Sequence, residues 1–167
     1  MTLSPQIMAS LASLKGFSGP GIRTAAWDDG QGVEVSVDFT AVDSLSCALQ
    51  ALRVSKAALR GATDAELQAW AGDIVRRVTY LLEPLAVLEY DAATQSVLVR
   101  SQPPTQKPDE IVYYEAVVQA PGLLTLMRYS TPRSDPGRRP IEMQMTQEAF
   151  RRLAEDLAAP VALPAAP

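Results

Sequence analysis

Four arginines in the C-terminal half of the chain have the type and spacing that could bind an anion. Three lie in the run 131–140, which is rich in proline and glycine, and the fourth lies just before it; they are Arg128, Arg133, Arg138 and Arg139. A guanidinium group offers a planar fork of N–H donors that matches a carboxylate or a phosphate. The segment therefore suggests an enzyme or a small-molecule binder that recognises an anion. The simpler interpretation is a long, solvated hairpin loop.

A second group of residues combines tyrosines, valine and methionine on two neighbouring predicted strands. Tyr113 and Val117 lie in the segment 111–119, and Met127 and Tyr129 lie in the segment 123–130. If these strands pair in simple register, Tyr113, Met127 and Tyr129 share one face of the sheet. Aromatic rings and methionine are enriched at protein interfaces. We predict that these four residues form an interface, although burial in the core would also explain them.

Acid–base catalysis by carboxylates has little support. Glu89, Glu115 and Glu142 each lie in or near a predicted strand, and burial can convert a glutamate into a general acid or base. No partner residue type accompanies any of them, so the sequence indicates no catalytic residue.

Three further motifs are better explained by structure than by chemistry. Residues 16–21 resemble a nucleophile elbow, but Pro20 stands where the second glycine is required. Asp28 and Asp29 precede a glycine, as in a hairpin turn, and lack the spaced oxygen ligands of a calcium loop. Cys47 lies near the start of a predicted helix, where a thiol can be reactive, but free cysteines are mostly buried. We expect a loop, a turn and a core residue, and no metal site.

The composition excludes several classes of function. The chain has no histidine, so nucleophiles activated by histidine and histidine-ligated metals are excluded. The net charge of −4 argues against a nucleic-acid partner. The single cysteine fits a reducing compartment. No apolar run approaches the roughly 18 residues of a membrane span, and the first 15 residues do not resemble a signal peptide. We therefore expect a cytoplasmic protein with no cofactor and no membrane partner.

The elements that must position these residues form a β-meander. Strands are predicted over 85–90, 96–101, 111–119, 123–130 and 141–145, with turn signals between them. Strands this close in sequence can pair only antiparallel, because a parallel return needs a crossover of a dozen or more residues. A hairpin over 22–27 and 33–40 precedes them, and its second strand alternates apolar and polar residues.

Four helices are predicted around this sheet, over 5–15, 44–59, 63–82 and 147–157. The third has the clearest signature, because Thr63 and Glu66 have the spacing of a capping box and Pro84 follows the helix. The fold class is therefore α+β: a single domain over residues 1–158, with a mostly antiparallel meander sheet of six to seven strands and about four helices packed around it. The alanine- and proline-rich tail, 159–167, is predicted to be disordered.

The functional expectation follows from the apolar residues on both faces of the sheet, which must be covered by helices or by another chain. The two central strands are apolar on both faces, and the two consecutive helices over 44–59 and 63–82 are expected to lie on the same side. The other face needs the terminal helices or another chain. We therefore expect a non-enzymatic binding or protein-interaction module, which forms a homodimer or binds another protein through its second face. The alternative is the anion-binding protein described above.

Small size, an acidic pI and an amphipathic C-terminal helix are also features of bacterial secretion chaperones. This is a likeness of composition, and it assigns no role to any residue of this chain.

Overall fold

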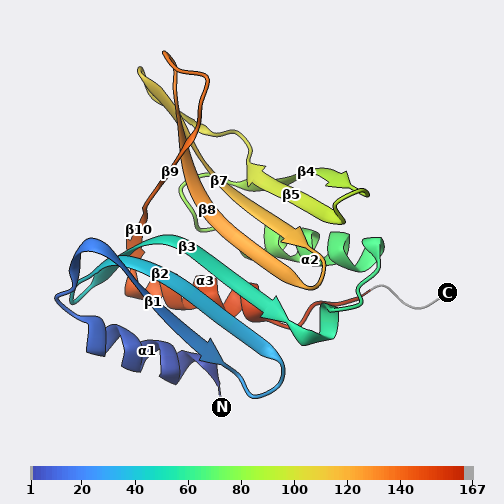
Figure 1. Ribbon diagram of the computed structural model, residues 1–167, viewed down its shortest axis with the longest axis horizontal. Coiled ribbons are helices and arrows are strands. Elements are labelled where there is room, and N and C mark those ends of the chain that lie inside the picture. The colour runs from blue at the N-terminus through green and yellow to red at the C-terminus, as the bar shows by residue number, and fades with distance from the viewer. Residues whose placement is uncertain (1, 164–167) are drawn as a thin grey trace.

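The computed structural model describes residues 2–163 and has the predicted α+β class (Figure 1). Ten strands form one antiparallel sheet in the described part of the chain, and seven of them follow in the order β1-β2-β3-β8-β7-β5-β4. The strands are β1 (Ser18–Asp28), β2 (Val33–Val42), β3 (Ser46–Lys56), β4 (Leu85–Asp91), β5 (Ser96–Ser101), β6 (Thr105–Gln106), β7 (Glu110–Gln119), β8 (Leu123–Pro132), β9 (Arg139–Ile141) and β10 (Met143–Thr146). The helices are α1 (Leu3–Leu14), α2 (Asp64–Arg77) and α3 (Gln147–Ala158).

The hydrophobic core lies between one face of the sheet and the three helices. Two ladders of cross-strand partners run across β2, β3, β8, β7 and β5, and every member is at most 2% exposed. The first ladder is Val35, Val54, Leu124, Val118 and Val97, and the second is Val37, Leu52, Leu126, Ala116 and Val99. Apolar residues of all three helices join the same core cluster. The helices therefore cover a single face, and α3 is seen behind β2 and β3 in Figure 1.

The predicted helix over 44–59 is wrong, because this segment forms the central strand β3. A register shift in the pairing of β2 with β3 leaves Gln50 without a partner on β2, since Asp38 pairs with Ala51 and Phe39 with Leu49. Leu49 and Leu52 both face the core as a result, although they are three residues apart. That spacing is the one expected on a helix. The β-bulge thus produced a helical pattern in a strand.

The capping box of α2 is confirmed. The Glu66 backbone N–H donates to Thr63 Oγ1 at 3.2 Å, and the Thr63 backbone N–H donates to Glu66 Oε1 at 3.3 Å. The helix ends at Arg77, five residues before the predicted end at residue 82. Thr146 caps α3 as predicted, because its hydroxyl oxygen accepts from the Ala149 N–H at 3.1 Å.

The C-terminal part of the meander differs from the prediction. The single strand expected over 141–145 is divided into β9, which pairs with β8, and β10, which pairs with β3. Of the tail predicted to be disordered, residues 159–163 are described, and Val161 packs against the core. Residues 164–167 of that tail lie outside the described residues.

The capping box gives a prediction about stability. We expect Thr63→Ala to lower the free energy of unfolding by about 1 kcal/mol, because it removes the side-chain acceptor at the helix N-terminus. Urea denaturation checks this, with Ser134→Ala in an exposed loop as the control that should leave the midpoint unchanged. An unchanged midpoint in Thr63→Ala would show that the cap contributes nothing.

Cys47 gives a second prediction. It is a buried residue of β3, and burial, together with the negative charge of Asp43, raises the pKa of its thiol to about 12. Because the thiolate is the reactive form, we expect slow reaction with a thiol reagent in the native protein and fast reaction in denaturant. Labelling at equal rates in both states would contradict a structural role.

Candidate functional site

The face of the sheet opposite the helices, called the open face below, is the first candidate surface. Its side chains come from the strand residues that alternate with the buried residues of the two core ladders. One row of cross-strand partners is Asp38, Ala51, Met127, Glu115 and Arg100, and the next row is Ser36, Arg53, Thr125, Val117 and Leu98. Within residues 2–163, every helix packs on the other face.

All four predicted interface residues lie on the open face. Tyr113 pairs with Tyr129 across β7 and β8, and their ring centroids are 5.9 Å apart. The Tyr129 hydroxyl donates to Met127 Sδ at 3.5 Å, and Val117 lies on the adjacent row. Tyr113 is 9% exposed, and the other three are partly exposed. The structure therefore brings these residues together as simple strand register predicts.

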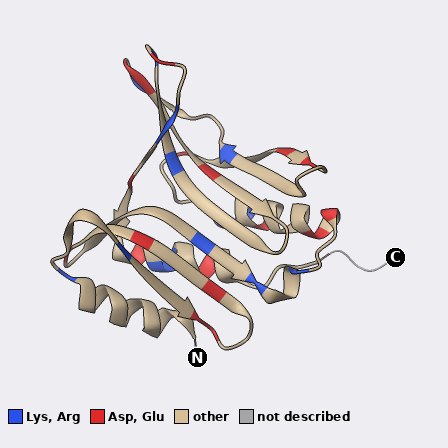
Figure 2. Cartoon of the chain, in the orientation of Figure 1, with Lys and Arg blue, Asp and Glu red and all other residues tan. Residues whose placement is uncertain are grey.

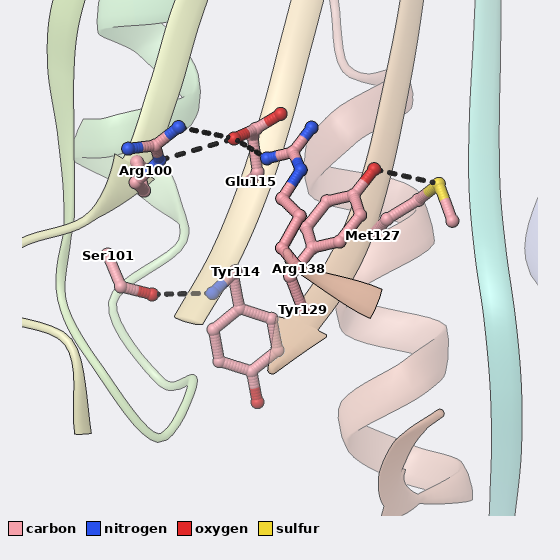
Figure 3. A network of polar contacts seen from close by, with 7 residues as sticks. All are labelled: Arg100, Ser101, Tyr114, Glu115, Met127, Tyr129 and Arg138. Atoms are coloured by element: carbon pink, nitrogen blue, oxygen red, sulfur yellow. Dashed lines mark hydrogen bonds and ion pairs between the residues drawn. The ribbon is translucent and has the colours of Figure 1, made fainter. Parts of the chain in front are cut away.

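A buried carboxylate joins two arginines at the centre of this face (Figure 3). Glu115 Oε2 accepts from Arg100 Nη2 at 2.8 Å and from Arg138 Nη1 at 2.7 Å. The Arg138 guanidinium lies 3.8 Å from the ring centroid of Tyr129, and that of Arg100 lies 4.9 Å from the ring centroid of Tyr113. The guanidinium groups thus lie over the aromatic rings while they neutralise the glutamate.

The electrostatics of Glu115 follow from two opposing effects. Burial raises the pKa of its carboxyl group, but hydrogen bonds and charges from Arg138 and Arg100 outweigh burial and hold this pKa below its usual value. The same contact raises the pKa of Arg138. A second pair, Asp38 with Arg53, lies towards β2, and Thr24 Oγ1 donates to Asp38 at 2.8 Å. The carboxylates are therefore stabilised as ions and are poor proton acceptors.

The four arginines predicted to bind an anion do not converge. Arg128 lies on the helix face of β8, only 6% exposed, and its Nη2 donates to Glu83 Oε2 at 2.8 Å. Arg138 lies on the open face with Glu115. Arg133, in the β8–β9 loop, donates from Nε to the Lys107 carbonyl oxygen at 3.0 Å. Arg139 is an exposed residue of β9. Alternation along β8 places Arg128 on the helix face, whereas the other three arginines lie beyond the end of this strand.

The glutamates considered for catalysis are also dispersed. Glu89 lies on β4, and Glu142 accepts from the Thr40 hydroxyl at 2.8 Å between β9 and β10. In the described part of the chain, no group of three or more cysteine, aspartate and glutamate side chains could hold a metal ion. Within residues 2–163, no helix has the length and apolar character needed to cross a bilayer.

Two residues of these networks were missed in the sequence. Arg100 is predictable, because it alternates with Val97 and Val99 and so must face away from the core. Glu83 gives no such signal, since it follows α2 in an irregular segment and is buried only by the tertiary fold.

Comparison with protein-family models, with curated proteins and with solved structures gave no match to this chain.

The Glu115 network predicts a pH-dependent contribution to stability. A carboxyl group whose pKa is lowered by folding stabilises the protein above its unfolded pKa, and this contribution is lost as the pH falls through the folded pKa. We expect Glu115→Gln to lower the free energy of unfolding by about 1–3 kcal/mol at pH 7, because it leaves two arginines without their counter-charge. The difference from wild type should shrink towards pH 3.

Urea midpoints at pH 7 and pH 3 measure this effect. Glu89→Gln is the matched control, since Glu89 is an exposed glutamate of β4, on the far side of β5 from the strand of Glu115. A loss that is equal at both pH values would show that the charge of Glu115 is not what stabilises the fold.

Proposed function

We propose that this protein is a non-enzymatic protein-interaction module that forms a homodimer through its open face. The observation that carries the proposal is the one-sided helical cover: α1, α2 and α3 all pack on the same face of the sheet. The other face nevertheless presents tyrosines, methionine and aliphatic residues at its centre, namely Tyr113, Tyr129, Met127, Val117 and Leu98. Tyr113 is 9% exposed and the other four are partly exposed, so a partner on this face would remove further apolar area from water.

The ion pairs of the open face are compatible with burial in an interface. Glu115 and Asp38 are each neutralised by arginine before any partner arrives. Such pairs cost less to cover than isolated charges, because their hydrogen bonds are already made. Arginine and tyrosine, which are in contact here, are also residue types that often contribute most of the binding energy at protein interfaces.

The distribution of charge favours a second copy of the same chain. Arg100 and Arg138 around Glu115 leave a net charge of +1 at the β5–β7 end, from two guanidinium groups and one carboxylate. At the β2 end, Glu34 and Asp38 with Arg53 leave −1, from two carboxylates and one guanidinium group (Figure 2). A twofold axis that lies in the plane of the interface and runs parallel to the strands would bring each end against the opposite end of the partner, as a self-complementary dimer requires.

Recognition of an anion by the arginine-rich loop has less support. Arg128 and Arg138 face opposite sides of the sheet, and each already contacts a carboxylate.

Light scattering on the purified protein tests the proposed dimer. We expect a mass of twice 18.0 kDa for the wild type and a monomer for Met127→Asp, because the substitution puts an unpaired charge in the centre of the interface. Met8→Asp on α1 is the matched control, since Met8 is 44% exposed on a helix outside the open face. A monodisperse wild-type monomer at all concentrations would refute self-association.

A further inference from the structure

A buried lysine lies at the end of the central strand, away from the open face. Lys56 is the last residue of β3 and is 4% exposed. Its backbone is held on both sides, because Lys56 N donates to the Gly122 carbonyl at 2.9 Å and Ala57 N donates to the Gly32 carbonyl at 2.8 Å. Gly122 has a φ of 91°, and a Cβ there would lie 2.6 Å from the Lys56 carbonyl oxygen. The position of Lys56 is therefore fixed by the turns of two hairpins.

The ammonium group of Lys56 has no counter-ion in the described part of the chain. Its Nζ lies 4.9 Å from the centroid of the Trp70 ring and donates to the Ala159 carbonyl oxygen. The carboxylate of Asp73 on α2 is instead bound by Arg76 and Arg77. An ammonium group has three donors, and buried lysines are almost always paired. Burial lowers the pKa of Lys56 to about 8, because it outweighs the opposing effect of the Asp73 charge.

Lys56 also lines a cavity of about 240 Å³ between the β1–β2 turn and the segment after α3. The lining is mostly aliphatic, with Val33, Ala58, Leu59, Ala158, Val161 and Leu163. Asp29 and Gln31 contribute polar atoms, and the Asp29 carboxylate accepts from the backbone N–H groups of Gln31 and Val33. Among the described residues of this lining, Lys56 is the one cationic side chain.

We propose that this cavity binds a small aliphatic carboxylate, whose carboxylate group pairs with Lys56 and whose chain lies against the aliphatic lining. The ligand supplies a counter-charge and hydrogen-bond acceptors in addition to the Ala159 carbonyl oxygen. A single cation beside an apolar wall matches a monoanion with a short chain. A phosphate dianion would bring one more negative charge than a carboxylate into a lining that already contains Asp29.

Titration calorimetry and thermal unfolding with hexanoate test the site. We expect saturable binding that raises the unfolding temperature, and an affinity about fourfold lower for each methylene removed between hexanoate and butyrate. Hexylamine and inorganic phosphate are the matched probes, since the first keeps the chain without the anion and the second keeps the anion without the chain. Neither should bind.

Two variants assign the site. Lys56→Met should abolish hexanoate binding while circular dichroism shows an intact fold. Leu163→Asp places a negative charge at the exposed rim, where Leu163 is 43% exposed, and should weaken hexanoate binding at least tenfold; it decides the question if Lys56→Met does not fold. Absence of saturable binding to the wild type, equal binding to either variant, or equal binding of hexylamine would overturn the proposal.

Discussion

The constraint on which this structure depends is that one layer of three helices covers one face of a wide antiparallel sheet. Cross-strand ladders of valine, leucine and alanine supply the apolar surface on that side. Because side chains alternate along a strand, the residues before and after a core residue point to the opposite face of the sheet. The chemistry of the open face is therefore a consequence of the core, and residues such as Glu115 and Met127 are neighbours because Ala116 and Leu126 are buried partners.

One buried pair of charged residues lies where strand β8 changes partners. Strand β8 pairs with β3 over its first half and with β9 over its second half, and Arg128 lies at this change. Its pairing with Glu83 is supported by Ser101 and Thr105, which donate to the glutamate at 3.0 and 2.8 Å, and by the Tyr114 ring against the guanidinium group. Removing one member of such a pair leaves an uncompensated buried charge, so the pair acts as a structural unit.

The two proposed sites use different parts of the fold and different chemistry. The open face is broad, its charges are paired, and it suits a protein surface. The Lys56 cavity is small and mostly aliphatic, and its cation lacks a counter-ion within residues 2–163, so it suits a small molecule. The arginine-rich loop contributes Arg138 to the open face.

Local features of the sequence determined the α+β class, the capping box at Thr63, the β1–β2 hairpin and the meander of β4, β5, β7 and β8, because caps, turns and alternation involve near neighbours in the chain. Strand parity also placed Tyr113, Val117, Met127 and Tyr129 on one face. Only the tertiary structure decided that residues 46–56 form a strand, since a bulge gave Leu49 and Leu52 a helical spacing. It alone decided the separation of Arg128 from Arg138 and the burial of Lys56, because those depend on partners distant in sequence.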